Sequence, residues 1–94
     1  MGKAEYKVEG GKMIKVQLKE KRNRIEEIKI TGDFFLHPEE LIEDLEKMLV
    51  GRYLNELDLA DSIRTLIESK GAALLGASPK DIAKCILMAG EGYG

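Results

Sequence analysis

Hydrophobic and polar residues alternate along the first third of the chain, which predicts strands with one buried face. The alternation covers residues 4–9, 13–20 and 25–31, and a glycine pair at 10–11 is placed for a turn between the first two segments. These segments follow one another closely, so we expect a three-stranded antiparallel meander. A sheet of three strands with one apolar face needs a covering layer.

One residue breaks this alternation. Ile28 and Ile30 continue the inward face of the third strand, whereas Ile25 has the opposite parity. An extra residue in one strand accounts for such a mismatch, because it shifts the following side chains to the other face. We therefore expect a bulge or an early turn at residues 25–27.

The covering layer is predicted in the rest of the chain, where apolar residues recur every three to four positions. This period favours helices at residues 38–50, 58–70 and 79–89, whereas residues 72–77 fit either a connector or a short strand. The predicted fold class is therefore α+β, with the three-stranded antiparallel meander covered on one face by three helices.

Local capping chemistry gives the expected helix starts. Pro38 fits the first position of the first helix, with His37 before it as the N-cap residue. Asp58 is the expected cap of the second helix. Ser78, followed by a proline and then by Asp81, is the expected start of the third.

The size and charge of the chain limit the number of domains and the kinds of partner that we expect. Residues 1–94 are expected to form one domain, with a frayed tail at 91–94. Charged residues make up 34% of the chain, but the net charge is only -2, so the two signs are mixed. The basic cluster from Lys19 to Arg24 is interrupted by Glu20 and fits a solvated hairpin tip better than a phosphate-binding patch. The composition therefore gives no indication of nucleic acid as a partner.

The candidate chemical groups are few. A single cysteine, Cys85, rules out an internal disulfide framework and indicates a reducing compartment. No apolar run approaches the roughly 20 residues that span a membrane, so we expect a cytoplasmic protein with no membrane partner. Cys85 lies in the middle of the third predicted helix, flanking its outward face, and His37 has no second imidazole or thiol near it in the sequence. We therefore predict no catalytic, cofactor-binding or metal-binding residue.

The remaining candidates for function are contacts with a partner. Gly32 indicates a positive φ or a close backbone approach, and Asp33 can accept hydrogen bonds from the amides that follow it. The rings of Phe34 and Phe35 point in different directions; residue chemistry favours two internal rings, and the alternative leaves one ring for a neighbouring protein. Met88, on the expected outward face of the third helix, completes the set of interface candidates.

These residues resemble a known family. The likeness is carried by the Gly-Gly turn, Met13-Ile14-Lys15-Val16, Ile28 to Phe35, Pro38-Glu39-Glu40, Leu45-Glu46, and Ser78 to Asp81, which sits where the family has its last helix. It covers nearly the whole chain, and Gly32-Asp33-Phe34-Phe35 is its most specific part. On these motifs the chain resembles the C-terminal accessory domain of lipoate-protein ligases.

The resemblance implies a function and a partner. Ligases of this family use ATP to activate lipoate to lipoyl-adenylate and then pass the lipoyl group to a lysine of an acceptor domain. In most of them the accessory domain is fused behind a large catalytic domain, which makes most contacts with lipoate and ATP. That domain is absent from this sequence, so the resemblance implies the archaeal arrangement, with a separate accessory subunit. We expect a large catalytic subunit that binds ATP, lipoate and magnesium as the partner, and a lipoyl acceptor domain as an indirect one.

The sequence is also compatible with two other functional classes. The small α+β plan is also similar to iron-sulfur scaffold and sulfur-acceptor proteins, although these depend on loop cysteines and Cys85 lies in a predicted helix. Iron or persulfide bound to the isolated chain would favour that class. A binding module for an unrelated protein is the other alternative, and a pull-down that recovers no lipoate-binding subunit would favour it.

Overall fold

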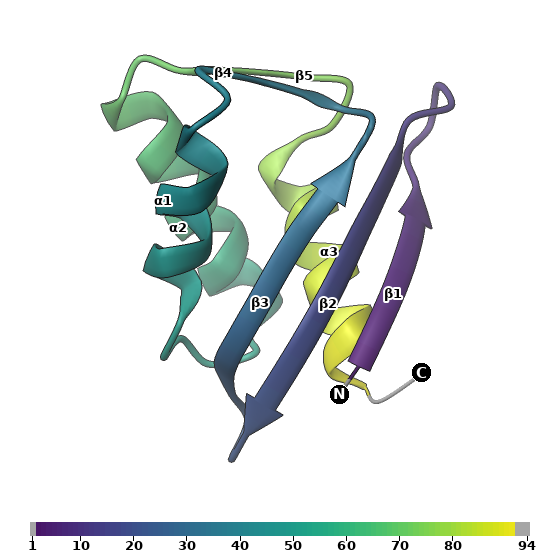
Figure 1. Ribbon diagram of the computed structural model, residues 1–94, viewed down its shortest axis with the longest axis vertical. Helices are drawn as coiled ribbons and strands as arrows, with labels where there is room; N and C mark the ends of the chain where they lie inside the picture. Colours follow the sequence, from purple (N-terminus) through teal and green to yellow (C-terminus); the bar gives the residue numbers. More distant parts are fainter. Residues whose placement is uncertain (1, 92–94) are drawn as a thin grey trace.

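The structure is a computed structural model that describes residues 2–91, so the end of the tail expected at 91–94 lies outside the described residues. A three-stranded antiparallel sheet, a two-stranded sheet and three helices make up this part of the chain (Figure 1). The strands are β1 (Gly2–Lys7), β2 (Met13–Lys21), β3 (Arg24–Gly32), β4 (Phe35–His37) and β5 (Ala73–Leu75). The helices are α1 (Leu41–Leu49), α2 (Glu56–Ser69) and α3 (Pro79–Gly90). The predicted α+β fold is therefore confirmed.

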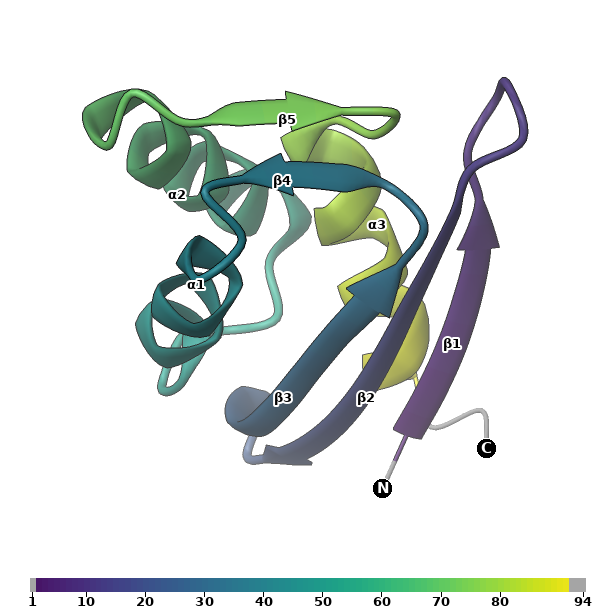
Figure 2. The same ribbon diagram turned by 45° about the horizontal axis from the view of Figure 1, so that its top comes forward.

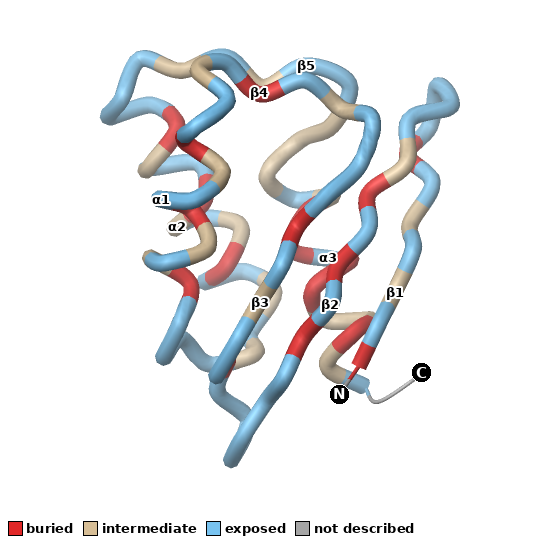
Figure 3. The backbone as a smooth tube through the Cα atoms, viewed as in Figure 1, coloured by how far each residue is buried: buried red, intermediate tan, exposed pale blue. Residues whose placement is uncertain are grey.

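The three-stranded sheet has the order β1-β2-β3, and its inward face packs Ile14, Val16, Leu18, Ile25 and Ile30 into the core. Along β2 the buried residues Ile14, Val16 and Leu18 alternate with exposed polar residues. Figure 3 shows the alternation of buried and exposed positions along this strand. Helix α3 packs across β1 and β2, α1 packs beside β3, and α2 packs against α3 (Figure 2). Within residues 2–91 no helix is long and apolar enough to cross a membrane.

The predicted bulge lies in β3. Lys19 pairs with Glu27 and the next residue, Glu20, pairs with Ile25, so Glu26 is the extra residue on the β3 side. The shift turns the Ile25 side chain inward, where it is only 1% exposed. The odd parity of this isoleucine was therefore a correct signal for a bulge at residues 25–27.

The expected start of the first helix is wrong. His37 is not an N-cap, because it belongs to β4 and pairs with Ala73 of β5. Pro38 is not the first helical residue either; its carbonyl oxygen accepts a hydrogen bond from the Leu41 amide at 3.1 Å, in a turn that precedes the helix. The N-cap residue is Glu40, which makes no side-chain capping bond, so no sequence signal marks this start.

Of the predicted starts of the other two helices, one is wrong and one is correct. Asp58 does not cap α2; the side chain of Asn55 accepts a hydrogen bond from the Asp58 amide at 3.1 Å, so the helix begins two residues earlier than expected. Ser78 caps α3 as predicted. Its hydroxyl accepts from the Asp81 amide at 3.2 Å, and the Asp81 carboxylate accepts from the Ser78 amide at 3.0 Å, which completes a capping box.

The second sheet joins two segments that are distant in the sequence. Residues 72–77, which fitted a connector or a short strand, contain β5, and β5 pairs antiparallel with β4. The three pairs are Phe35 with Leu75, Leu36 with Leu74, and His37 with Ala73. We call this two-stranded sheet the ribbon. It lies across the end of the molecule where β3 leads into β4 and α3 begins (Figures 1 and 2).

Candidate functional site

The turn that leads into the ribbon is fixed by Gly32 and Asp33. Gly32 has a φ of +154°, and a Cβ at this position would collide with the Met13 carbonyl oxygen and lie 2.9 Å from the Phe34 ring. Both expectations for Gly32 are thus confirmed. The Asp33 carboxylate accepts a hydrogen bond at 2.6 Å from the Met13 amide, not from the amides that follow it. Asp33 therefore fastens the turn to the start of β2, which lies 20 residues earlier in the chain.

The two phenylalanine rings have different environments. Phe34 is half-buried and packs against the core, whereas Phe35 is 49% exposed. The interpretation with two internal rings is therefore wrong, and the alternative, in which one ring remains free, describes the structure. The physical reason is that Phe35 opens β4, where successive side chains point to opposite faces and Leu36 takes the buried position.

Phe35 belongs to an exposed group on the outer face of the ribbon. We call the side chains of Phe35, His37, Ala73 and Leu75 the ribbon patch. Leu75 is 60% exposed and lies directly opposite Phe35, while the rings of Phe35 and His37 are stacked with centroids 6.0 Å apart and planes 4° apart. Cross-strand neighbours of this kind are close enough to form one continuous apolar surface.

The sequence reasoning missed three members of the ribbon patch, His37, Ala73 and Leu75. The signal for Leu75 is the Leu74-Leu75 pair, because adjacent leucines in a strand face opposite sides and one of them must be outward. The ribbon also has open edges, since β4 and β5 pair only with each other in the described part of the chain. Open strand edges present backbone amides and carbonyls to which a partner strand can bind.

Met88 is partly buried but is not among the side chains that pack against the core. It lies in the last turn of α3, next to Ala89, whose carbonyl is in close contact with Gly2 at the start of β1. The structure brings Gly32, Asp33 and the two phenylalanines together at the ribbon end and leaves Met88 near the opposite end of the sheet. Its role as an interface residue stays a prediction.

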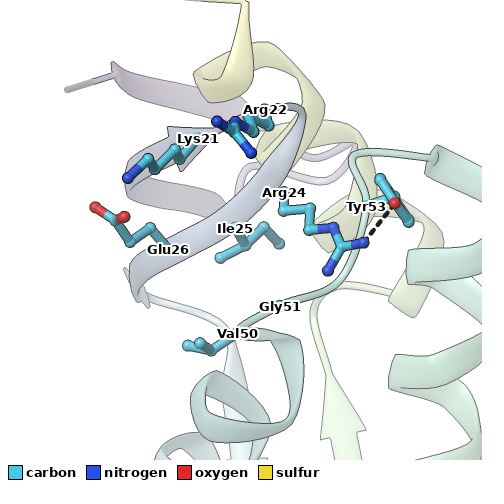
Figure 4. Close-up of a pocket in the computed structure, with 8 residues that line it drawn as sticks. All are labelled: Lys21, Arg22, Arg24, Ile25, Glu26, Val50, Gly51 and Tyr53. Carbon is cyan, nitrogen blue, oxygen red and sulfur yellow. Dashed lines mark hydrogen bonds between the residues drawn. The ribbon is translucent and has the colours of Figure 1, made fainter.

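A second surface feature lies at the end of the molecule opposite the ribbon, where β2 turns into β3 (Figure 4). We call it the basic cleft. It has a volume of about 630 Å³ and lies between this hairpin and the segment that joins α1 to α2. It is lined by Lys21, Arg22, Arg24, Ile25, Glu26, Val50, Gly51 and Tyr53.

Backbone hydrogen bonds hold the two walls of the basic cleft together. The Ile25 amide donates to the Arg52 carbonyl at 2.9 Å, and the Gly51 amide donates to the Ile25 carbonyl at 2.7 Å. The Leu54 amide donates to the Asn23 carbonyl at 2.9 Å. The segment between α1 and α2 thus extends the sheet at the edge of β3, and its backbone is held against the hairpin.

Arg24 and Tyr53 connect the walls through their side chains. The guanidinium of Arg24 lies 4.5 Å from the centre of the Tyr53 ring and donates a hydrogen bond to the Tyr53 hydroxyl at 2.6 Å, which Figure 4 draws as a dashed line. The sequence interpretation of residues 19–24 as a solvated tip is right about exposure. It missed that Tyr53, from a distant segment, faces the same arginine.

The charge of the basic cleft is unbalanced. Its one carboxylate, Glu26, already forms an ion pair with Lys19 at 3.4 Å. Among the ion pairs within residues 2–91, none involves Lys21, Arg22 or Arg24. Three cationic side chains therefore gather at this end of a chain whose net charge is -2.

Cys85 has the environment of a structural residue. It lies on the buried face of α3, rather than flanking the outward face, and its Sγ is 3.5 Å from the Ile14 carbonyl oxygen. Burial raises the pKa of the thiol to about 11, so the thiolate required of a metal ligand or sulfur acceptor is disfavoured. In the described part of the chain, no cluster of three or more His, Cys, Asp or Glu residues is arranged to hold a metal ion.

Comparison with known proteins places the chain in a family. The family described as Bacterial lipoate protein ligase C-terminus matches residues 3–86. Lipoate-protein ligase A subunit 2 of Thermoplasma acidophilum is 36% identical over 74 residues, which cover 79% of this chain and 76% of the relative. A chain from the structural analysis of an archaeal lipoylation system, a bipartite lipoate protein ligase and its E2 lipoyl domain from T. acidophilum, is similar with a TM-score of 0.76 and 33% identity, covering 89% of this chain and 91% of that one. This protein therefore belongs to the family of lipoate protein ligase C-terminal domains.

Proposed function

We propose that this chain is the accessory subunit of a two-component lipoate-protein ligase. It binds a separate catalytic subunit and enables that subunit to activate lipoate with ATP to lipoyl-adenylate, which then lipoylates an acceptor domain. The observation that carries the proposal is the match to a relative named as subunit 2 of such a ligase, over similar shares of both chains.

We propose that the two chains have different roles. We assign ATP, lipoate and magnesium to the catalytic subunit, and none of them to this chain alone. This chain contributes binding energy, which favours the conformation of the catalytic subunit that forms the adenylate. We also place the protein in the cytoplasm, where a reducing environment keeps the buried Cys85 as a free thiol.

The ribbon patch is the proposed contact with the catalytic subunit. Interfaces between subunits that stay together have apolar, aromatic-rich centres, and Phe35 with Leu75 supplies such a centre. The turn at Gly32 and Asp33 holds Phe35 in place from the side of β2, and Phe34 anchors the same turn to the core. The contact therefore rests on a rigid support, which lowers the entropy lost on binding.

The function is tested by reconstitution. The purified chain is added to the catalytic subunit of the same organism, and lipoate-dependent exchange between ATP and pyrophosphate is measured. This assay reports adenylation alone, because it needs no acceptor domain. We expect exchange to rise and then saturate as the chain is titrated. An exchange rate that is unchanged by the chain would refute the proposed function.

The ribbon patch is tested by a charge placed in its centre. Phe35→Asp is expected to weaken binding of the catalytic subunit at least ~30-fold, the loss of about 2 kcal/mol that defines an interface hot spot. The matched control is Leu57→Asp, because Leu57 is 75% exposed on α2 and lies outside the ribbon. Affinities are measured by calorimetry. Equal losses in the two variants would refute the placement of the contact.

A further inference from the structure

The two surface features differ in chemistry and lie at opposite ends of the molecule. The ribbon patch is apolar and follows the exit from β3, whereas the basic cleft lies at the hairpin where β3 begins (Figures 1 and 4). A partner seated on the ribbon patch therefore leaves the hairpin end of this subunit open to a second macromolecule.

We propose that the basic cleft is the site at which this subunit receives an acidic surface of the lipoyl acceptor domain. The proposal rests on the proposed function, because it assumes that the catalytic subunit occupies the ribbon patch. It adds a role in the second half-reaction, in which the lipoyl group is transferred, to the role in adenylation.

The cations around the basic cleft are free to bind carboxylates. Lys21, Arg22 and Arg24 gather around one cleft and form no ion pair within residues 2–91. Arg24 uses one N–H for the Tyr53 hydroxyl, so most of its five donors remain available. Because its guanidinium is held over the Tyr53 ring, little side-chain entropy is lost when a carboxylate binds.

The apolar part of the cleft indicates a protein surface rather than a free phosphate. Val50 and Tyr53 are 50% and 52% exposed beside the cations. Arginine and tyrosine are enriched at protein interfaces, and such exposed apolar groups have no role in holding a small, strongly hydrated anion. Small-molecule sites enclose most of the ligand surface, whereas the cationic side chains of this cleft are all exposed.

The type of association distinguishes the acceptor domain from the catalytic subunit. An acceptor must bind before each transfer and leave after it, so its contact has to be transient. Charged surfaces suit such contacts, because they raise the association rate and select the partner without requiring high affinity. The apolar ribbon patch suits the lasting contact with the catalytic subunit.

The test separates the two half-reactions. In the reconstituted ligase, Arg24→Glu is expected to leave lipoate-dependent pyrophosphate exchange unchanged and to raise the KM for the E2 lipoyl domain of the same organism about 10-fold at low salt. The difference from the wild type is expected to shrink as salt is added. The matched control is Lys29→Glu, which makes the same charge change on the exposed face of β3 outside the cleft and is expected to leave the KM unchanged.

A second variant guards against a folding defect in Arg24→Glu, whose side chain packs on Tyr53. Lys21→Glu changes an exposed side chain at the end of β2 that makes no such contact, and we expect it to raise the KM in the same direction. An unchanged KM in both variants, or an equal rise in Lys29→Glu, would overturn the proposal. So would saturable binding of inorganic pyrophosphate to the isolated chain that is lost in Lys21→Glu, because it would assign the cleft to a small anion. If the wild-type chain did not raise the pyrophosphate exchange rate of the catalytic subunit, the proposed function would be refuted instead.

Discussion

The ribbon end and the hairpin end of this domain are built from different kinds of interaction. At the ribbon end, the chain is positioned by close packing at Gly32, by the carboxylate of Asp33, and by pairing between strands 40 residues apart, Phe35 with Leu75. At the hairpin end, it is positioned by backbone hydrogen bonds between β3 and the segment after α1, and the side chains around the cleft are exposed except for that of Ile25.

The ribbon patch depends on the core beneath it, whereas the basic cleft depends on it much less. Each outward residue of the ribbon patch has a buried or partly buried neighbour in its strand, such as Leu36 beside Phe35 and Leu74 beside Leu75, so the patch exists only while the core beneath it is intact. The side chains around the basic cleft project from a backbone that is already satisfied by hydrogen bonds. Substitutions of the packed residues beneath the ribbon patch are therefore expected to cost more stability than substitutions of the exposed side chains of the cleft.

The largest expected effect is at Gly32. Gly32→Ala places a Cβ against the Met13 carbonyl and the Phe34 ring, which is expected to lower the free energy of unfolding by about 3 kcal/mol or more. The control is Gly51→Ala at the hairpin end, where φ is +88° but a Cβ meets nothing within 4 Å, so only about 1 kcal/mol of backbone strain is expected. Urea unfolding of both variants measures the difference. Equal losses of unfolding free energy in the two variants would mean that both ends tolerate an added Cβ equally well.

A smaller effect separates the two faces of the ribbon. Leu36→Ala removes a buried side chain and is expected to cost about 2–3 kcal/mol, whereas Phe35→Ala is expected to cost less than about 1 kcal/mol, because its ring is half in solvent. The same unfolding experiment compares the neighbours. A larger loss for Phe35→Ala would show that its ring supports the fold, and would remove it as a free contact for the catalytic subunit.

The sequence predicted those parts of the fold in which a residue's environment follows from its near neighbours. Alternation identified the three long strands and the bulge before Ile28, because the inward side chains of that sheet are buried or partly buried and the outward ones are exposed. The Ser78 cap was equally local, since both hydrogen bonds of its capping box join residues three apart. Local chemistry was sufficient at these positions.

The ribbon was not predictable in the same way. Three-residue strands are too short for a period of two to show, and His37 enters β4 because it pairs with Ala73, far along the chain. The exposure of Phe35 follows from that pairing. Tyr53 and Arg24 likewise meet only because the segment after α1 joins the edge of β3. The candidate interface at Gly32 to Phe35 was visible in the sequence, but its second half, Leu75, required the tertiary structure.

The smallest expected effect on stability is at Tyr53. Tyr53→Phe removes the hydroxyl that accepts a hydrogen bond from Arg24 but keeps the ring under the guanidinium, so the free energy of unfolding is expected to change by less than about 0.5 kcal/mol. Both groups are solvated, and water replaces the lost partner. Urea unfolding at low and high salt is the measurement, with Tyr53→Ala as the comparison that also removes the ring. A loss above about 1.5 kcal/mol for Tyr53→Phe would mean that this pair supports the fold, and the contrast between a core-dependent ribbon and an independent cleft would fail.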